Sequence, residues 1–386
     1  MMIVAGEASG DAHAAALVRS LRERAPHTDI QFFGATGREM REAGVESIVR
    51  SDDLSILGLA EIAGALPRFW RAYSALKRAA IERRPDAVVL VDWPDFNFRL
   101  ARALRRSGLR VIYYISPQVW AWRSHRLRNI RRDVDLLLTI LPFEKGWYEA
   151  RGVHHVEFVG HPLAGAVRAR KGLEEFCLGH KLDPKRPVIA LLPGSRYKEL
   201  ERVLPYMLEA ASLLSKRRAD VQFILALAPG REPAQAEAHM LAAERKGLAL
   251  PSTLRLVQNE TRDALSASTA AAITSGTATL EAALLGVPQV IVYKESRLNW
   301  HVLGRLINTE HYGLTNLIAG ERLATELIQN DLTGERLAEE LLLLLDEERN
   351  RKFRARLNEA TSKLGSGGAS LRAADAVLSA VRLWKR

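Results

Sequence analysis

Short runs of consecutive apolar residues recur along the first half of the chain, separated by stretches with helical spacing. These runs are residues 3–5, 31–33, 87–91, 111–115, 136–140 and 156–159. A strand that is apolar on both faces is typical of a parallel sheet, because helices cover both of its sides. The first half therefore predicts a parallel sheet wrapped by helices.

A second series of the same kind occupies the later part of the chain. Its apolar runs are residues 188–192, 223–226, 270–274 and 289–293, and from Thr333 the pattern is helical, with a glycine-rich break at 365–368. We therefore expect an α/β protein with two doubly wound domains facing a central cleft, because open α/β sheets bind ligands at the carboxyl ends of their strands.

The boundaries follow from where the pattern lapses. Residues 168–187 are charged and punctuated by glycine and proline, which is typical of a linker. We expect an N-terminal domain over 1–167, a linker over 168–187, a C-terminal domain over 188–345 and terminal helices over 346–386. A chain of 386 residues is long enough for two such cores.

Composition indicates a globular protein with anionic partners. Apolar residues make up 47% of the chain and charged residues 26%. The net charge of +11 favours a phosphorylated substrate or an acidic membrane surface, although a basic surface without a specific partner explains it equally well. Lysine and arginine are spread throughout and no recognition motif is present, so nucleic acid is the least favoured partner.

The compartment is indicated by three features. Cys177 is the single cysteine, so an intramolecular disulfide is excluded and a reducing cytoplasm fits. Residues 1–6 lack a basic segment and form too short an apolar run for a signal peptide. The longest charge-free stretch, residues 264–280, is too rich in Ala, Ser and Thr to span a membrane, so we expect any membrane contact to be peripheral.

Two loops in the second series have the composition of phosphate-binding turns. Residues 193–196 and residues 275–281 each follow an apolar strand and open a helix. A helix start offers unpaired N–H groups and the positive end of the helix dipole, which suit a diphosphate. Glu281 lies one turn beyond Thr277 and is expected to bind the ribose hydroxyls. The expected diphosphate ligands are Ser195, Arg196, Ser275, Gly276 and Thr277.

The first strand of the chain is followed by residues 6–11, with the sequence Gly-Glu-Ala-Ser-Gly-Asp. The spacing of a dinucleotide-binding fingerprint is absent, and Glu7 would repel a pyrophosphate. A carboxylate and a hydroxyl at a strand's carboxyl end suit a sugar, so Glu7 and Ser9 are candidate site residues. The alternative is a capped turn in which Asp11 bonds the helix start.

Residues 92–97 close another apolar strand with two carboxylates and an amide. Asp92 stands at the strand tip, where it is placed to accept a proton from an incoming hydroxyl. Asp95 or Asn97 is expected to cap the next helix, and Asn97 is also a candidate substrate ligand. A structural role for both aspartates is the alternative.

Residues 116–123 follow the strand at 111–115 and contain two indoles. Trp120 and Trp122 offer stacking faces for a sugar ring or an acyl chain, and Arg123 can donate to phosphate. The alternative is that one indole of this pair belongs to the core.

A metal site is not expected. Asp133 and Asp135 match the D-x-D by which some glycosyltransferases hold a divalent metal, but this pair leads directly into a strand and short patterns often match by chance. No other spacing of histidines or cysteines suggests a metal, and no cofactor is expected.

The stretch 58–80 carries apolar residues at helical spacing with basic residues nearby. Such a helix either packs into the core or lies on a membrane surface. The candidate membrane contacts are Ile62, Leu66, Phe69 and Trp70.

Seven segments taken together resemble the lipid-A-disaccharide synthase family. They are residues 6–11, 92–97, 116–122, 141–144, 160–162, 192–196 and 275–281, in the family's order and over nearly the whole chain. The resemblance implies a GT-B glycosyltransferase with two Rossmann-like domains, the first for the acceptor and the second for a UDP-sugar, without a metal or cofactor.

The resemblance also implies the reaction. An inverting transfer would join UDP-2,3-diacylglucosamine to 2,3-diacylglucosamine 1-phosphate (lipid X), giving the β-1,6-linked lipid A disaccharide 1-phosphate and UDP. By the same resemblance, Asp92 is the general base, Glu7 lines the catalytic site, Arg196 serves the donor diphosphate and Asn316 belongs to the donor site.

The family's setting is implied as well. Its members are cytoplasmic proteins that bind peripherally at the inner face of the cytoplasmic membrane of Gram-negative-type bacteria. Their C-terminal segments can cross to the N-terminal domain or to a partner subunit, so a homodimer is one expected assembly.

Three positions depart from the family pattern. Ala35-Thr36 replaces a double-glycine loop, Thr315 stands where a proline is common, and Trp93 replaces a smaller residue beside the expected base. Two rival functions stay open. One is another GT-B UDP-sugar enzyme, such as a UDP-N-acetylglucosamine 2-epimerase or a wall-precursor N-acetylglucosaminyltransferase, and the other is a non-catalytic UDP-sugar-binding protein.

Overall fold

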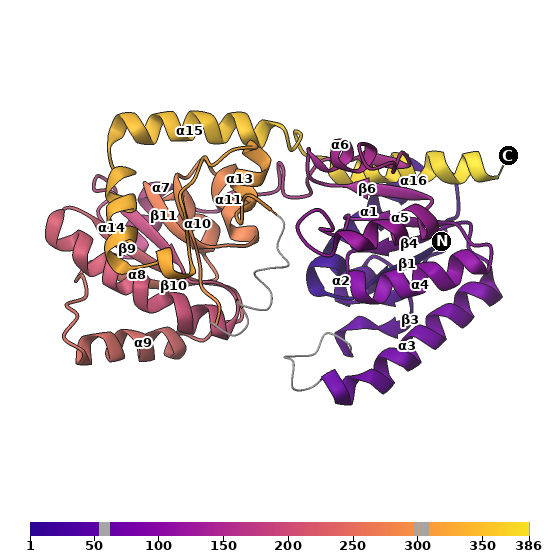
Figure 1. The fold of residues 1–386 in the computed structure, drawn as a ribbon, viewed down its shortest axis with the longest axis horizontal. Helices are drawn as coiled ribbons and strands as arrows, with labels where there is room; N and C mark the ends of the chain where they lie inside the picture. The colour runs from indigo at the N-terminus through magenta and orange to yellow at the C-terminus, as the bar shows by residue number, and fades with distance from the viewer. Residues whose placement is uncertain (54–61, 297–299, 301–308, 386) are drawn as a thin grey trace. The chain divides into compact units, whose positions relative to one another are not determined.

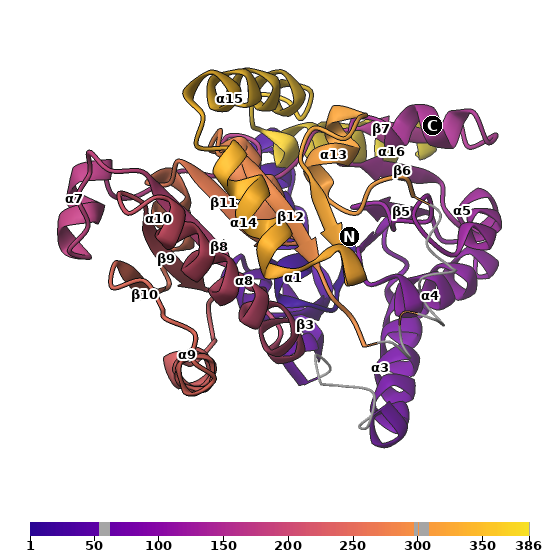
Figure 2. The ribbon, with the colours of Figure 1, turned by 60° about the vertical axis from the view of Figure 1, so that its left-hand side comes forward.

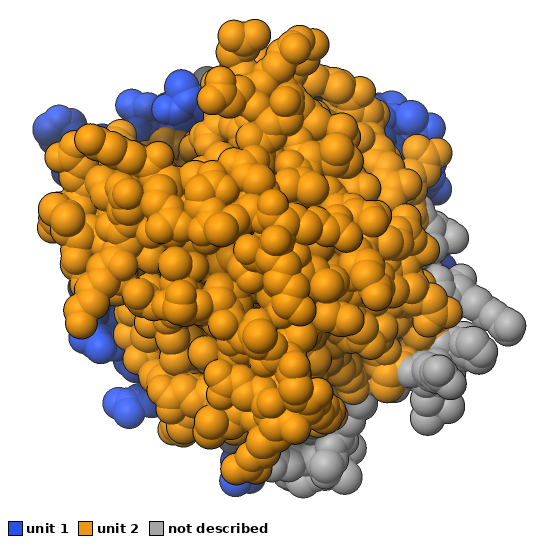
Figure 3. Space-filling model, turned by 90° about the vertical axis from the view of Figure 1, so that its left-hand side faces the viewer, with its two compact units in different colours: residues 1–162, 364–386 blue, residues 163–363 orange. Residues whose placement is uncertain are grey.

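The computed structural model divides into two compact units, each with its own parallel sheet. One unit comprises residues 1–162 and 364–386 and the other residues 163–363, as coloured in Figure 3. The structure describes residues 1–53, 62–296, 300 and 309–385, without the side chains of residues 53 and 62–66. Within these ranges no helix combines the length and apolar character needed to cross a bilayer.

The first unit is built on a seven-stranded sheet with the order β3-β2-β1-β4-β5-β6-β7 (Figure 1). The order reverses between β1 and β4, which creates a topological switch point at their carboxyl ends. The strands are β1 (Met2–Ala5), β2 (Phe33–Thr36), β3 (Glu46–Arg50), β4 (Val88–Val91), β5 (Val111–Tyr114), β6 (Leu136–Thr139) and β7 (Val156–Phe158).

Helices cover both faces of this sheet. On β4, Val89 and Val91 face α1 (Ala8–Arg24) and α16 (Ala369–Trp384), while Val88 and Leu90 face the opposite layer. Burial on both faces explains why the central strands β1 and β4 are apolar at every position. The opposite layer contains α3 (Ile62–Arg83), α4 (Pro94–Arg106), α5 (Leu127–Asp133) and α6 (Glu144–Glu149), and the short α2 (Arg38–Glu42) packs on α1.

The second unit repeats the plan with a six-stranded parallel sheet in the order β10-β9-β8-β11-β12-β13 (Figure 2). The order reverses between β8 and β11, so their carboxyl ends form its switch point. The strands are β8 (Val188–Leu192), β9 (Gln222–Leu227), β10 (Leu254–Gln258), β11 (Ala270–Thr274), β12 (Gln289–Tyr293) and β13 (Glu326–Ile328).

The helices of the second unit also form two layers. Ile189 and Leu191 of β8 face α8 (Tyr197–Arg217), α9 (Pro233–Arg245) and α14 (Gly334–Leu343). Val188 and Ala190 face α7 (Leu173–Gly179), α10 (Thr261–Ser266) and α11 (Thr277–Leu284). Two further helices, α13 (Leu314–Ala319) and α15 (Glu347–Ser362), pack on each other.

The end of the chain completes the first unit. Leu364 follows shortly after the end of α15, and its carbonyl accepts a hydrogen bond from the His161 N–H at 3.0 Å. The Arg372 Nε of α16 donates to the Val159 carbonyl at 2.8 Å, and Ala373 and Val377 lie in the core against α1. Helix α16 is therefore an integral layer of the first unit.

Three details differ from the sequence-based expectations. Strands β3, β10 and β13 were not expected, and all three lie at sheet edges. Strand β2 begins at Phe33, so the run 31–33 mostly precedes it. The segment 168–187 contains helix α7, whose Phe176 and Cys177 are buried in the core of the second unit, rather than a purely polar connection.

Candidate active site

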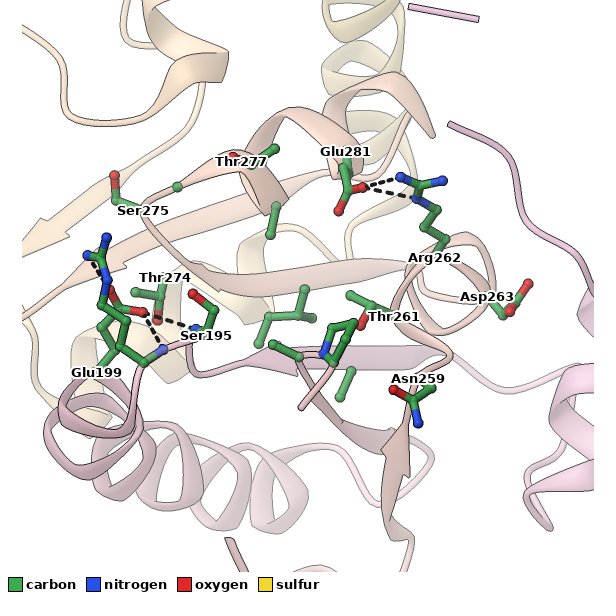
Figure 4. A pocket seen from close by; sticks show the side chains of 18 of the residues that line it. Ser195, Glu199, Asn259, Thr261, Arg262, Asp263, Thr274, Ser275, Thr277 and Glu281 are labelled. Atoms are coloured by element: carbon green, nitrogen blue, oxygen red, sulfur yellow. Dashed lines mark hydrogen bonds and ion pairs between the residues drawn. The ribbon is translucent and has the colours of Figure 1, made fainter. Parts of the chain in front are cut away.

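A pocket of about 580 Å³ lies in the second unit, at the switch point of its sheet (Figure 4). Its walls come from the loops after β8 and β11, from the end of β9 and from the start of α10. Two loops far apart in the sequence meet here because they follow the two adjacent strands between which the order reverses. The predicted donor residues that line the pocket are Ser195, Arg196, Ser275, Gly276, Thr277 and Glu281.

The helix start after β8 already holds an internal anion. Glu199 Oε2 accepts hydrogen bonds from the Ser195 and Arg196 N–H groups at 3.0 and 3.1 Å. Its other oxygen accepts from Arg196 Nη1 at 3.2 Å. Gly194 has φ +111°, and a Cβ there would stand 2.5 Å from the Glu199 carboxylate, so the loop admits only glycine at this point. These N–H groups are therefore not free to bind a diphosphate in this conformation.

The helix start after β11 is arranged differently. The Ser275 hydroxyl donates to the Tyr312 carbonyl at 2.8 Å, which ties this loop to the segment before α13. Gly276 is the N-cap of α11, and no side chain caps it. The start of α11 is therefore the better-placed anion site of the two.

Glu281 is held by an arginine at the rim of the pocket (Figure 4). Arg262 donates from Nε at 2.9 Å and from Nη2 at 2.7 Å, and both bonds end on Oε1. The second carboxylate oxygen, Oε2, takes neither of these bonds. The geometry fits a carboxylate that is oriented by a cation and accepts from neighbouring ligand hydroxyls.

Sequence reasoning missed part of the pocket wall. Asn259 follows β10 with φ +61°, an uncommon conformation for a residue other than glycine. Asp263 accepts hydrogen bonds from the Arg170 and Lys171 N–H groups at 2.5 and 3.0 Å and so fixes the segment that precedes α7. No local signal marks these residues, because they meet only in the folded unit. The missed lining residues include Arg168, Arg170, Asn259, Arg262 and Asp263.

Asn316 is buried and does not line this pocket. Its amide nitrogen donates to the Ala324 carbonyl and to Glu326 at 2.8 and 2.9 Å, and its amide oxygen accepts from the Ala324 N–H. The neighbouring Thr315 hydroxyl donates to the Thr279 carbonyl and accepts from Gln289. The segment is therefore held by buried hydrogen bonds although it lacks the usual proline.

In the first unit, Asp92 follows β4 at the switch point and is half-buried. Its φ is +47° and that of Trp93 is +51°, so two successive residues hold left-handed conformations. Such strain concentrates at functional sites. Burial, and after it the charge of Glu7, raises the pKa of Asp92. A raised pKa makes this carboxylate a better proton acceptor.

The Asp92 backbone is fixed by two buried side chains. The Tyr113 hydroxyl donates to the Asp92 carbonyl at 2.6 Å, and the Asn97 amide donates to the same oxygen at 2.7 Å. Asn97 is fully buried, so the structure does not present this predicted substrate ligand to a substrate. Its position supports Asp92 instead.

Glu7 and Ser9 are exposed at the start of α1, after β1. Asp11, in contrast, is buried and caps the start of α2 by accepting from the Gly37 and Glu39 N–H groups, both at 2.7 Å. The alternative reading of this motif is thus partly correct, but the helix that Asp11 caps is α2 rather than its own.

The two indoles after β5 have different environments. Trp120 is buried and its Nε1 donates to Glu144 at 3.0 Å, whereas Trp122 is 37% exposed. The Arg123 guanidinium lies 4.2 Å from the centre of the Trp122 ring and pairs with Asp95 at 3.0 Å. Trp122 and Arg123 are therefore accessible to a ligand, and Trp120 is a core residue.

The D-x-D pair is engaged by arginines. Asp133 is buried and pairs with Arg132 at 2.6 Å, and Asp135 pairs with Arg110 at 2.9 Å. Elsewhere in the described ranges, no group of three or more His, Cys, Asp or Glu side chains is arranged to hold a metal ion.

The predicted membrane contacts on α3 point in different directions. Phe69 packs against the core, with its ring centre 6.0 Å from that of Trp93. Trp70 is 66% exposed. The side chains of Ile62 and Leu66 lie outside the described residues.

Comparison with known proteins adds to this geometry. A family model described as "Lipid-A-disaccharide synthetase" matches residues 1–380. A protein from Geobacter sulfurreducens named lipid-A-disaccharide synthase is 45% identical over 379 residues, which is 98% of this chain and 96% of the relative.

Solved structures share the fold at low sequence identity. The UDP-GlcNAc 2-epimerase from Neisseria meningitidis, bound to UDP-GlcNAc, superposes with a TM-score of 0.61 at 13% identity, over 98% of this chain and 99% of that one. CalG4, the calicheamicin glycosyltransferase, gives a TM-score of 0.58 at 16% identity, over 98% and 97%. The predicted α/β fold with two Rossmann-like domains of the GT-B kind is confirmed.

Proposed function

The chain belongs to the lipid-A-disaccharide synthase family and is a glycosyltransferase of lipid A biosynthesis, and we propose that it makes the β-1,6-linked disaccharide itself. The substrates are UDP-2,3-diacylglucosamine and 2,3-diacylglucosamine 1-phosphate, and the products are the disaccharide 1-phosphate and UDP. The pocket at the second switch point supports this proposal most strongly, because it gathers the groups that a uridine diphosphate requires.

The second unit binds the donor. Glu281, oriented by Arg262, accepts from the ribose hydroxyls. The start of α11 at Ser275–Thr277 receives the diphosphate, and Arg196 adds a cation. Preorganised donors of this kind stabilise the charge that develops on the departing UDP.

The first unit supplies the base. The acceptor's 6-hydroxyl oxygen attacks the anomeric carbon of the donor while its proton passes to Asp92. The bond from that carbon to UDP breaks, and its electron pair leaves on the diphosphate. A single displacement of this kind inverts the anomeric configuration. Glu7 serves the reaction by raising the pKa of Asp92.

The acceptor carries a phosphate and acyl chains. Trp122 and Arg123 form an accessible pair on the first unit that suits these groups. Ser9, exposed at the start of α1, is a further proposed acceptor contact. Because both substrates are lipids, the enzyme works at the inner face of the cytoplasmic membrane. The exposed Trp70 on α3, beside Arg71 and other basic residues, is the proposed contact. A homodimer stays a prediction.

One incubation separates this function from its rivals. The purified protein is supplied with both acylated substrates, and mass spectrometry should detect the disaccharide and UDP in equal amounts. A 2-epimerase, the activity named for one structural neighbour, would convert UDP-N-acetylglucosamine without an acceptor. A non-catalytic binding protein would bind UDP and form no product. Either result would overturn the proposal.

A further inference from the structure

The segment Ser116–Arg123, which we call the tryptophan loop, has an exposed end and a buried beginning. Trp122 and Arg123 are accessible, whereas Ser116 and Trp120 are buried. The accessible end can contact a ligand in a reproducible way only if the buried part is held in one position. The position of Trp122 and Arg123 therefore depends on the contacts that hold Ser116 and Trp120.

Two side chains of one short helix hold the tryptophan loop. The Tyr148 hydroxyl lies 2.6 Å from the Ser116 hydroxyl and donates to the Pro117 carbonyl at 3.1 Å. Glu144 accepts from Trp120 Nε1 at 3.0 Å. Both side chains come from α6, four residues apart and so on one face of the helix.

Glu144 is bonded on both carboxylate oxygens. Oε1 accepts from Trp120, and Oε2 accepts from the Ile140 and Leu141 N–H groups at 3.1 and 2.9 Å. Its side chain is buried, only 1% exposed. All three partners are neutral N–H donors, so hydrogen bonds rather than an opposite charge keep this acid inside the protein.

Such a site is energetically expensive. Burying an acid without a cation carries a desolvation penalty, and an apolar residue of similar size would avoid it. Burial raises the pKa of Glu144 to about 7, although the three hydrogen bonds oppose this shift. Tyr148 is also fully buried and bonded through its hydroxyl. Two buried polar side chains on one helix face, both aimed at the same loop, point to a role for what they hold.

We infer that Glu144 and Tyr148 are positioning residues that fix the tryptophan loop so that Trp122 and Arg123 meet the sugar acceptor. The inference rests on the proposed function, because it assigns the accessible end of the loop to the acceptor. It gives a role to the segment 141–144, which the reaction itself does not use. Neither residue touches the substrate; both act through the loop.

The test is the kinetics of Glu144→Gln and Tyr148→Phe with the acceptor varied at saturating donor. Glutamine has a single acceptor oxygen, so it loses either the bond from Trp120 or the two bonds from the Ile140 and Leu141 N–H groups, and phenylalanine removes both bonds of Tyr148 to the loop. We expect the acceptor KM to rise at least fivefold in each variant, with UDP affinity unchanged within twofold. UDP affinity reports on the second unit alone and would not move.

Glu149→Gln is the matched control, because it neutralises another carboxylate of α6, one that is exposed and lies 3.9 Å from Lys145. Its acceptor KM should equal that of the wild type. If Glu144→Gln does not fold, Trp120→Phe removes the hydrogen bond between Trp120 and Glu144 from the other side and should also raise the acceptor KM. In the double variant Glu144→Gln/Trp120→Phe the two effects should not add.

Two results would overturn the inference. One is an acceptor KM within twofold of the wild type in both Glu144→Gln and Tyr148→Phe. The other is a loss of UDP affinity as large as the rise in acceptor KM, which would indicate general damage. Failure of the proposed function is distinguishable, since the wild-type protein would then form no disaccharide at all.

Discussion

The Ser195 N–H donates to Glu199 Oε2 at 3.0 Å, so the first turn of α8 carries its own carboxylate where a diphosphate was expected. A helix start stabilises one anion at a time, and a second negative charge close to Glu199 is repelled. The donor must therefore either displace Glu199 or use the start of α11. In both cases the charge of Glu199 opposes UDP binding.

Glu199→Gln should bind UDP more tightly than the wild type, by about threefold to tenfold. The amide oxygen can still accept from the Ser195 N–H, while the negative charge is gone and Arg196 is released toward the ligand. Isothermal titration calorimetry with UDP measures the change. Weaker binding would show that Glu199 instead holds Arg196 in its productive position.

Glu281→Ala should discriminate less between UDP and 2′-deoxy-UDP than the wild type does. If Glu281 accepts from both ribose hydroxyls, removing its carboxylate should weaken UDP about tenfold and 2′-deoxy-UDP much less, since the latter already lacks one partner. Competition binding of the two nucleotides gives the ratio. Glu237→Gln, an exposed carboxylate on α9, is the control and should bind both as the wild type does. An unchanged ratio in Glu281→Ala would place the ribose elsewhere.

Asp92→Asn should abolish turnover while UDP binding stays nearly intact, because the asparagine amide cannot take the acceptor's proton. A loss of about a thousandfold or more in kcat is expected. Asp86→Asn removes an exposed carboxylate of the same unit, paired with Lys385, and should keep the wild-type rate. Near-normal turnover in Asp92→Asn would mean that another group is the base.

The acid limb of the pH profile depends on Glu7. The pKa of Asp92 is raised by burial first and by Glu7 second, so the base loses activity at a higher pH than an ordinary aspartate. Glu7→Gln removes the second cause and should move the acid limb of kcat/KM to lower pH. The profile is measured at saturating donor. If the acid limb does not move, Glu7 does not influence the pKa of the base.

The fold was predictable where burial is two-sided. Each residue of Val88–Val91 is apolar because helices cover both faces of β4. Strand β3 was missed because it lies at the sheet edge, where Glu46 and Arg50 are exposed. An edge strand is defined by its pairing with a distant neighbour, and that pairing leaves little trace in its own sequence.

The same distinction holds for the site. The loops after β8 and β11 could be predicted because a strand, a glycine and a helix start are local features. The roles of Glu199 and Asp11 could not, because each depends on which N–H groups the fold brings to the carboxylate. Asn259 enters the pocket through the left-handed turn after β10, which its own sequence does not indicate.

His161 makes the first unit sensitive to acid. Burial, with a smaller contribution from His13, lowers the pKa of His161 to about 4. The folded state therefore keeps this histidine neutral, while the unfolded chain takes up a proton near pH 6.5. Its contribution to the free energy of unfolding is lost as the pH falls from 6.5 toward 4, by about 2 kcal/mol at pH 5.

His161→Gln removes this titration. Relative to the variant, the wild type should therefore lose about 2 kcal/mol in the free energy of unfolding between pH 7.5 and pH 5. Urea unfolding followed by a probe in the first unit measures the difference. His27→Gln, at an exposed position of the same unit, should give a curve parallel to the wild type. Parallel curves for His161→Gln as well would contradict the prediction.

Gly6 leaves room for the aromatic side chain next to the proposed base. A Cβ at Gly6 would overlap with the ring of Trp93, closer than any non-bonded contact allows. That ring is stacked on Phe96, with centres 4.1 Å apart and planes 11° from parallel, so it cannot move without disturbing the turn that carries Asp92. The glycine is therefore required by packing and not by its backbone angles.

Gly6→Ala should reduce kcat by at least tenfold, because the displaced indole shifts the adjacent Asp92 away from its working position. Gly10→Ala is the matched control in the same motif. A Cβ there meets Ala5 Cβ at 3.7 Å and the Val91 carbonyl at 3.9 Å, which are ordinary contacts. That variant should keep the wild-type rate. If both variants are equally active, the Trp93 ring can move aside, and its packing against Gly6 does not set the position of the base.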